Sequence, residues 1–270
     1  MNSKLEIYQV DAFTAQPFKG NPAGVCILES EPHEKWMQNV AMEMNLSETA
    51  FIFPGKDSFN IRFFSPQAEI PLCGHATLSS AHILFETGSV SADKEIVFES
   101  KAGTLMTRKT GRWITMDLPS YSIEKIRAIP GFKTITGIKA TEYYKTAHGW
   151  ILAVAAEESD VKKMTPDFAS MVTAGIGKLI VTAPASETNY DFCVRCFVPE
   201  LGINEDPATG SAHCALAPYW AGRTGKTDFI SHQISRRSGI IKVTDRGKRV
   251  EISGQAITVL KGTLLVQPDR

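Results

Sequence analysis

The residues best suited to chemistry in this chain stand in the stretch Cys73-Gly74-His75, where a thiol and an imidazole flank a glycine. Both groups are common zinc ligands, and both can take up and return protons. Leu78 and Ala81 then recur at helical spacing, which predicts a helix that starts at Gly74. The backbone N–H groups of such a start attract a carboxylate or a developing oxyanion. Metal binding, thiol chemistry and proton transfer to a small molecule are all open on these residues alone.

Two carboxylates are the other candidates for acid–base work. Glu48 stands at the entry to a very apolar stretch that reads as a strand, where partial burial would raise its pKa towards the range of a general base. Asp206 lies in the turn-rich loop that leads to a second expected helix start, at Gly210 and Ser211. The structural alternatives are an edge carboxylate at Glu48 and an ordinary turn or cap residue at Asp206.

Two cysteine patterns suggest metal binding, but their context favours packing. Cys193 and Cys196 form a CxxC pair on a stretch that alternates as a strand, and residues i and i+3 of a strand point to opposite faces. His213 and Cys214 could complete a zinc site with the Cys-Gly-His stretch. They are adjacent on an expected helix, however, where neighbours point about 100° apart. We therefore expect no metal at either place.

An internal repeat organises the elements that must position these residues. RFFSPQ at 62–67 is echoed by RCFVPE at 195–200 at an offset of 133 residues, and GHAT at 74–77 is matched by ATGS at 208–211 at an offset of 134. Each half reads as a strand, a turn, a helix and a hairpin. We predict an α/β (α+β) fold of two pseudo-symmetric halves, with a small-molecule site in a cleft between them.

The boundary between the halves is expected near Leu118-Pro119-Ser120, where the first copy of the repeat ends. This predicts a first half over 1–118 and a second half over 119–270. A last strand over 257–267 falls beyond the second copy of the repeat, and it can return to the first half.

The composition favours a protein that acts on a small molecule in the cytoplasm. Lys and Arg together number 29 and balance 29 Asp and Glu, so nothing favours a nucleic-acid partner. No stretch has the length and apolarity of a signal peptide or a membrane span, which predicts no membrane partner. The 5 cysteines are an odd number in a long chain, which suits reduced thiols better than a disulfide framework.

At these residues the sequence resembles the PhzF-like family, which is named for the phenazine-biosynthesis isomerase and has the diaminopimelate-epimerase fold of two pseudo-symmetric halves. The resemblance runs along nearly the whole chain. It rests on FKGNPAGV at 18–25, MNLSETAF at 44–51, RFFSPQAEIPLCGHATL at 62–78 and EDPATGSAHC at 205–214. It implies an isomerase that needs no metal or organic cofactor, a small amino or hydroxy carboxylic acid as substrate, and a homodimer.

The resemblance also implies roles for single residues. Glu48 matches the glutamate that moves a proton between two carbons of a dihydro-hydroxyanthranilate-like substrate. The other expected site residues are His75 and Asp206 in catalysis and Gly74, Ser211, Gly210 and Cys73 in substrate binding.

Two alternative functions remain open on the same scaffold. The amino-acid epimerases of this fold use two opposed cysteines, and Cys73 matches the first, whereas its expected repeat mate, Pro207, transfers no proton. A mixed pair of Cys73 with Asp206 or Glu48 is possible, because a thiolate at a helix N-terminus has a lowered pKa. The third possibility is a small-ligand-binding protein without catalytic activity.

Overall fold

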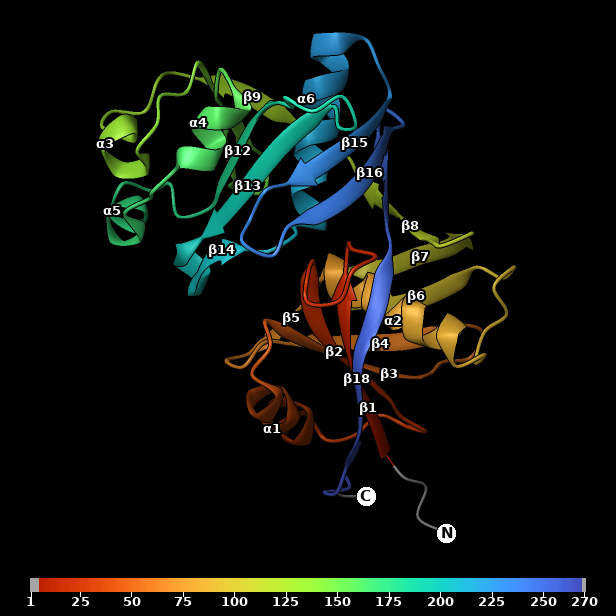
Figure 1. The fold of residues 1–270 in the computed structure, drawn as a ribbon. Helices are drawn as coiled ribbons and strands as arrows, with labels where there is room; N and C mark the ends of the chain where they lie inside the picture. The colour runs from red at the N-terminus through yellow and green to blue at the C-terminus, as the bar shows by residue number, and fades with distance from the viewer. Residues whose placement is uncertain (1–4, 269–270) are drawn as a thin grey trace. The chain divides into compact units, whose positions relative to one another are not determined.

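The computed structural model describes residues 5–268, and the chain divides into two compact units (Figure 1). Unit 1 comprises the chain up to Asp117 and again from Ser253, and unit 2 comprises Leu118–Ile252. Among the described residues, no helix is long and apolar enough to cross a membrane.

Unit 1 is a curved, mainly antiparallel sheet. Its elements are β1 (Leu5–Ala12), β2 (Asn21–Ile27), α1 (Glu34–Met44), β3 (Glu48–Pro54), β4 (Phe59–Phe64), β5 (Glu69–Ile70), α2 (Gly74–Glu86), β6 (Ile96–Ser100), β7 (Gly103–Thr110), β8 (Trp113–Pro119, which runs past the unit boundary) and β18 (Ala256–Leu264). The strands pair in the order β18-β1-β2-β3-β4-β6-β7-β8. Only β2 with β3 and β4 with β6 are parallel, and the short β5 extends the pairing of β4.

The helix α2 forms the centre of unit 1. Ten of its 13 residues are buried, which is typical of a helix enclosed on all sides. It contacts β1, β2, β3 and β18, and at its start Gly74 also faces Met116 of β8. Because the helix meets strands from both ends of the pairing order, the sheet curves around it.

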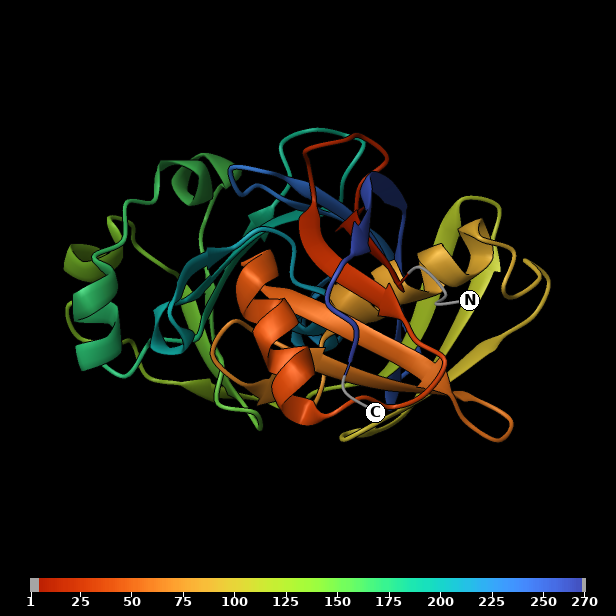
Figure 2. The ribbon, with the colours of Figure 1, turned by 90° about the horizontal axis from the view of Figure 1, so that it is seen from below.

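The helix α1 lies on the outer side of the same sheet, across β3 and β4 (Figure 2). Trp36, Met37 and Val40 of α1 recur at helical spacing and are buried in one cluster with Phe51 and Phe64. The rings of Trp36 and Phe51 meet edge to face at 5.9 Å. This packing covers the outer face of β3, the strand that begins with Glu48.

Unit 2 repeats the pairing pattern of unit 1. Its elements are β9 (Ile123–Ile126), α3 (Phe132–Thr136), β10 (Glu142–Thr146), β11 (Ile151–Val154), α4 (Glu158–Lys163), α5 (Phe168–Thr173), β12 (Leu179–Pro184), β13 (Phe192–Val198), the 3₁₀ turn η1 (Pro199–Leu201), β14 (Ile203–Asp206), the 3₁₀ turn η2 (Gly210–Ala212), α6 (His213–Thr224), β15 (Asp228–Gln233), β16 (Gly239–Asp245) and β17 (Arg249–Gly254, which runs past the unit boundary). The order β9-β10-β11-β12-β13-β15-β16 is parallel only at β11 with β12 and at β13 with β15, and β14 extends β13.

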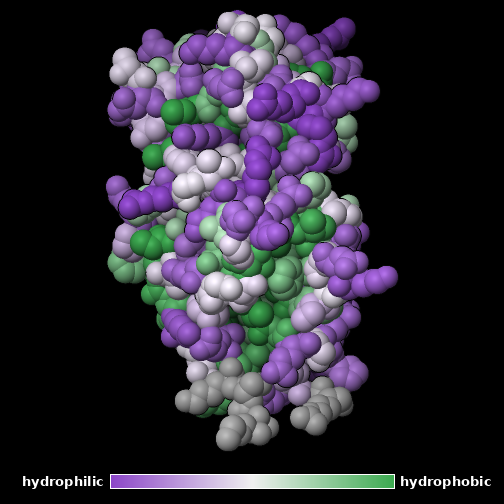
Figure 3. All heavy atoms as spheres, turned by 90° about the vertical axis from the view of Figure 1, so that its right-hand side faces the viewer, coloured by the Kyte–Doolittle hydropathy of each residue, from purple (hydrophilic) through white to green (hydrophobic). Residues whose placement is uncertain are grey.

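Both units therefore build the same arrangement from the two copies of the repeat, and the mixed α+β fold predicted from the sequence is confirmed. The surface differs between the units. Figure 3 shows hydrophobic residues gathered in the part of one face that belongs to unit 1. Of the large hydrophobic side chains that are exposed among the described residues, most belong to unit 1: Phe18, Met42, Met106, Leu260, Leu265 and Val266.

Candidate active site

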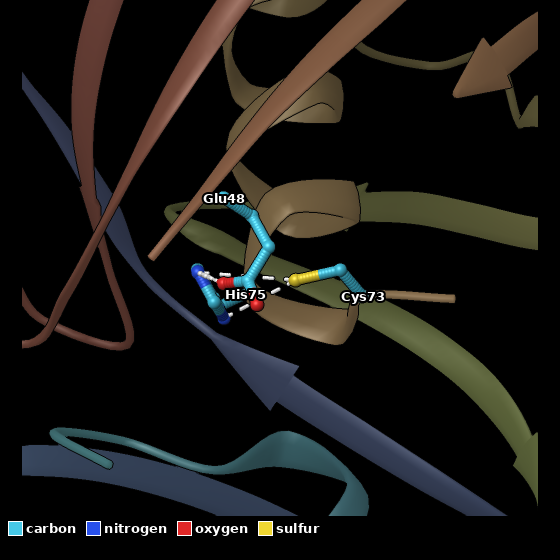
Figure 4. A group of neighbouring side chains, drawn as sticks. All are labelled: Glu48, Cys73 and His75. Carbon is cyan, nitrogen blue, oxygen red and sulfur yellow. Dashed lines mark hydrogen bonds and ion pairs between the residues drawn. The ribbon is translucent and has the colours of Figure 1, made fainter. Parts of the chain in front are cut away.

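Three of the residues predicted from the sequence meet in unit 1: Glu48, Cys73 and His75 (Figure 4). Glu48 is the first residue of β3, Cys73 caps the N-terminus of α2, and His75 is the second residue of that helix. One carboxylate oxygen, the sulfur and one ring nitrogen all lie within 4.8 Å of one another. Cys73 and His75 are buried, and the side chain of Glu48 is 14% exposed. The cluster thus joins a strand start to a helix start that is 25 residues further along the chain.

His75 is the centre of this cluster. Its Nε2 lies 3.1 Å from Oε2 of Glu48, and the sulfur of Cys73 lies 3.4 Å from Nδ1 and 3.8 Å from Nε2. Two further neighbours of His75 were not predicted from the sequence. The hydroxyl of Ser47 is 3.3 Å from Nε2, and the amide of Asn21 is 3.2 Å from Nδ1. Both stand inside the segments that carried the family resemblance, which was the signal that could have found them.

The charges of the cluster follow from these contacts. Burial by itself would raise the pKa of Glu48, but His75, Ser47 and Cys73 together outweigh it and hold that pKa below its usual value. Burial likewise opposes protonation of His75, yet Cys73 and Glu48 raise its pKa well above the usual value. Burial and then the charge of Glu48 raise the pKa of Cys73 to about 11. At neutral pH the cluster therefore holds an ionised Glu48 and a neutral Cys73 thiol, and His75 is the side chain whose affinity for a proton its neighbours increase.

The sequence-based expectation of a raised pKa at Glu48 is accordingly wrong. The desolvation that it invoked is present and is the largest single effect, but the imidazole 3.1 Å away, together with Ser47 and Cys73, outweighs it. Because Cys73 is a neutral thiol at pH 7, the carboxylate of Glu48 is the charge that favours protonation of His75. The NH₂ nitrogen of Asn21 faces Nδ1 of His75, so Nδ1 accepts from Asn21 in this arrangement.

One oxygen of Glu48 is left with hydrogen-bonding capacity. Within the described part of the chain, Oε2 is buried and accepts no hydrogen bond, although it lies within ion-pair distance of His75. Buried polar atoms are nearly always hydrogen-bonded in folded proteins, and exceptions concentrate at functional sites. A buried carboxylate oxygen of this kind can accept a proton from a bound molecule.

A bidentate ion pair holds the segment that leads to Cys73. Arg62 of β4 donates from Nε and Nη2 to the two carboxylate oxygens of Glu69 in β5, at 2.8 and 2.6 Å. The guanidinium also lies over the ring of Phe64, 5.3 Å from its centroid. Only 14% of the Arg62 side chain and 10% of the Glu69 side chain are exposed, so solvent weakens this pair less than a surface one. Glu69 stands four residues before Cys73, and the pair therefore fixes the approach to the cluster.

Unit 2 contains an equivalent bidentate ion pair. Arg195 of β13 donates from Nε and Nη2 to the two carboxylate oxygens of Glu205 in β14, at 2.7 and 2.9 Å, and lies 4.9 Å from the ring centroid of Phe197. Glu205 directly precedes Asp206. The duplication of an arginine, a stacked phenylalanine and a glutamate in the short strand shows that both units hold their helix-start loops in one way.

The loop from Asp206 to Ser211 in unit 2 is further held by its own hydrogen bonds. The side chain of Gln233 accepts from the backbone N–H of Thr209 at 2.7 Å and donates to the backbone oxygen of Asp206 at 2.7 Å. The hydroxyl of Thr209 donates to the carboxylate of Asp206. Ser211 lies in η2, the turn before α6, so the predicted residues Asp206, Gly210 and Ser211 occupy one ordered segment.

This segment also corrects the alignment of the repeat. Cys73 caps α2 and Thr209 caps η2, so the structural counterpart of Cys73 is Thr209 rather than Pro207. The offset changes because the 3₁₀ turn η1 adds three residues between the arginine and the cap in unit 2. Neither Thr209 nor Pro207 carries a thiol. In the corrected register, Ser211 corresponds to His75.

The other cysteine and histidine patterns do not form a metal-binding group among the described residues. Cys193 and Cys196 are buried free thiols on β13, as expected for packing. His213 is fully buried, 2.9 Å from the backbone oxygen of Thr209 through Nδ1 and 2.8 Å from the hydroxyl of Ser231 through Nε2. Since a carbonyl oxygen only accepts, Nδ1 carries the proton and Nε2 accepts from the serine. Burial lowers the pKa of His213 to about 4, so it is neutral at pH 7.

The chain matches a known protein family along nearly its whole length. The family model described as "Phenazine biosynthesis-like protein" matches residues 10–262. The chain belongs to the PhzC-PhzF family. An uncharacterized isomerase of Halalkalibacterium halodurans is 44% identical over 262 residues, covering 96% of this chain and 98% of that protein. The crystal structure of a PhzF-family protein from Enterococcus faecalis has a TM-score of 0.91 at 38% identity, covering 98% of this chain and 100% of that one.

The fold extends beyond the PhzC-PhzF family. A probable proline racemase from Agrobacterium radiobacter has a TM-score of 0.65 at 12% identity and covers 98% of this chain and 94% of its own, which shows a shared fold alone. Within the family, a second relative, from Pseudomonas aeruginosa, is 40% identical and is also named an uncharacterized isomerase. The relatives therefore support an isomerase in general terms.

Proposed function

We propose that this chain is a cofactor-independent isomerase that moves a proton between two carbons of a small amino or hydroxy carboxylic acid, with Glu48 as the group that carries the proton. The observation that supports this most directly is the buried Oε2 of Glu48, which accepts no hydrogen bond from the described residues. A carbon-to-carbon proton shift needs one group that takes a proton and returns it, and an ionised carboxylate with a free acceptor site meets that need.

The effect of His75 on Glu48 restricts the substrate. His75 beside Glu48 lowers the pKa of the carboxyl group, which makes Glu48 a weak base. A weak base removes a proton from carbon only where the resulting negative charge is delocalised. The substrate therefore carries the reacting C–H next to a conjugated system or a carbonyl group, and His75 stabilises the negative charge that develops.

The start of α2 offers a place for the substrate's carboxylate. The first backbone N–H groups of this 13-residue helix, at Gly74 and His75, carry positive partial charge next to the cluster. The roles of Asp206, Gly210 and Ser211 in binding or proton transfer are part of the same proposal, as is the homodimer, which light scattering on a gel-filtration column would test.

The alternative of an epimerase with Cys73 and Glu48 as its two groups fits the geometry less well. An epimerase places a base and an acid on opposite faces of one carbon, each about 3–3.5 Å from it, so the two groups stand about 6 Å apart or more. The reactive atoms of Glu48 and Cys73 lie within 4.8 Å of each other. A pair of Cys73 with Asp206 stays an alternative, and Cys73→Ala tests it, because an epimerase of that kind loses activity and the proposed isomerase keeps most of it.

The decisive experiment is proton exchange in deuterated water. We expect the protein, incubated with a metabolite extract and a chelator, to produce an isomer of one compound with deuterium on carbon, detected by mass spectrometry. Glu48→Gln should slow this reaction by about 100-fold or more, because it removes the group that takes the proton. Glu43→Gln, which changes an exposed glutamate of α1, is the matched control and should leave the rate unchanged.

Two results would contradict the proposal. If Glu48→Gln retains the rate of the unchanged protein, Glu48 is not the proton carrier. If a compound binds but shows no exchange at carbon with any preparation, the chain is a binding protein on an isomerase fold.

A further inference from the structure

We propose that Glu48, Cys73 and His75 together form a binding site for Zn²⁺ or another thiophilic divalent cation, and that the bound ion inhibits the enzyme. The binding site rests on the geometry of the three side chains alone. The inhibition rests on the proposed function, because it requires that Glu48 carry the proton.

The spacing of the three donor atoms suits tetrahedral zinc. Zinc binds sulfur at about 2.3 Å and nitrogen or oxygen at about 2.0–2.1 Å, so two ligand atoms of one tetrahedral ion lie about 3.3–3.8 Å apart. In the cluster, Nε2 of His75 lies 3.1 Å from Oε2 of Glu48 and 3.8 Å from the sulfur of Cys73. Movements of a few tenths of an ångström bring these two pairs to ligand positions. The third pair, the Glu48 oxygen and the Cys73 sulfur, lies within 4.8 Å and has to come to about 3.6 Å. Three protein ligands with one open position is the arrangement of catalytic zinc sites.

Two further features of the cluster point to a cation. Oε2 of Glu48 is buried and faces Nε2 of His75, so an ion bound to both atoms replaces one ion-pair contact between them. The amide nitrogen of Asn21 lies 3.2 Å from Nδ1 of His75. Metal-binding histidines commonly donate from the ring nitrogen that does not bind the ion. A turn of the Asn21 amide, which brings its oxygen to the place of its nitrogen, gives Nδ1 an acceptor for this bond and leaves Nε2 for the metal.

The charge of the site balances on binding. On binding, the proton of the Cys73 thiol passes to the buffer, and His75 binds the ion through Nε2 with its one remaining ring proton on Nδ1. New bonds form from zinc to a thiolate, a carboxylate and a neutral imidazole, whose total charge of −2 matches the ion. The carboxylate oxygen that would accept the substrate's proton is then occupied, so zinc and substrate exclude each other.

Cobalt is the probe for the site, because a Co²⁺–thiolate bond gives a charge-transfer absorption band in the near ultraviolet. The chelator-treated full chain is titrated with Co²⁺ in the absence of any substrate, and Zn²⁺ is then added as competitor. We expect the band to saturate at one Co²⁺ per chain and to disappear as Zn²⁺ replaces cobalt. Zn²⁺ should also inhibit the deuterium-exchange activity, and a chelator should restore it.

Variants assign the band to the cluster. Cys73→Ala should abolish it, whereas Cys26→Ala, which removes a fully buried thiol elsewhere in unit 1, should leave it unchanged. Asn21→Ala should keep the band but weaken Co²⁺ binding by about 10–100-fold, because it removes the support of His75. Circular dichroism checks that each variant is folded.

The site is refuted if the unchanged protein shows no thiolate band, or if the band survives Cys73→Ala in the folded variant. Inhibition by the metal is refuted if cobalt binds but activity persists. Failure of the function itself is a separate result, since the effect of Glu48→Gln on exchange is measured with a chelator present and cobalt binding is measured without substrate.

Discussion

Acidification should destabilise unit 2 through His213. Its side chain is fully buried and neutral, with Nδ1 donating to Thr209 and Nε2 accepting from Ser231, and burial lowers its pKa to about 4. In the unfolded chain the same side chain has a pKa of about 6.5. Between these values the unfolded state binds a proton that the folded state does not, so stability decreases as the pH falls from 6.5 to 4. A tenfold change in proton affinity corresponds to about 1.4 kcal/mol, and the full loss is therefore about 3 kcal/mol.

Urea unfolding at a series of pH values measures this loss, and nuclear magnetic resonance of the histidine rings measures the pKa directly. His213→Asn retains a donor for the carbonyl of Thr209 but does not titrate, so its free energy of unfolding should depend less on pH by about 3 kcal/mol over the same range. His33→Asn, at an exposed position, should behave as the unchanged protein. The reasoning is refuted if the ring of His213 titrates near pH 6.5, or if His213→Asn and the unchanged protein have the same pH dependence.

Two further substitutions test the packing that positions the cluster. Arg62→Met leaves the largely buried carboxylate of Glu69 without its bidentate partner and should lower the free energy of unfolding by about 2 kcal/mol. Arg62→Lys should restore part of this stability. Equal stability of all three proteins in urea would show that the pair contributes nothing. Gly254→Ala should destabilise the protein by about 1–3 kcal/mol, because the new Cβ would lie 2.5 Å from a ring carbon of Phe13. In Gly222→Ala, the new Cβ in α6 meets no atom within 4 Å, so this variant should be more stable by up to about 1 kcal/mol. Calorimetry compares the two variants, and similar melting temperatures would contradict the argument.

The two halves of the chain illustrate why the fold was accessible from the sequence. Strand alternation, glycine-bounded hairpins and helical spacing are local signals in the sequence. Because of the repeat at an offset near 133 residues, each of these signals occurs twice in the chain. The mixed α+β fold followed from these signals. The register of the repeat at the helix starts did not, because η1 lengthens the loop of unit 2 and only the cap positions reveal that Thr209 matches Cys73.

The candidate site was likewise predicted only in part from the sequence. The sequence by itself determined the residue types able to transfer a proton, and it placed Glu48 at a strand start and Cys73 and His75 at a helix start. Only the tertiary structure decided that these three side chains meet within 4.8 Å, with Asn21 and Ser47 beside them. It also reversed the expected pKa shift of Glu48. The burial of Glu48 can be predicted from the apolar residues that follow it in the sequence. The electrostatic field at its carboxylate depends on the distance to a polar or charged group elsewhere in the chain, and that distance is set only when the sheet curves around α2.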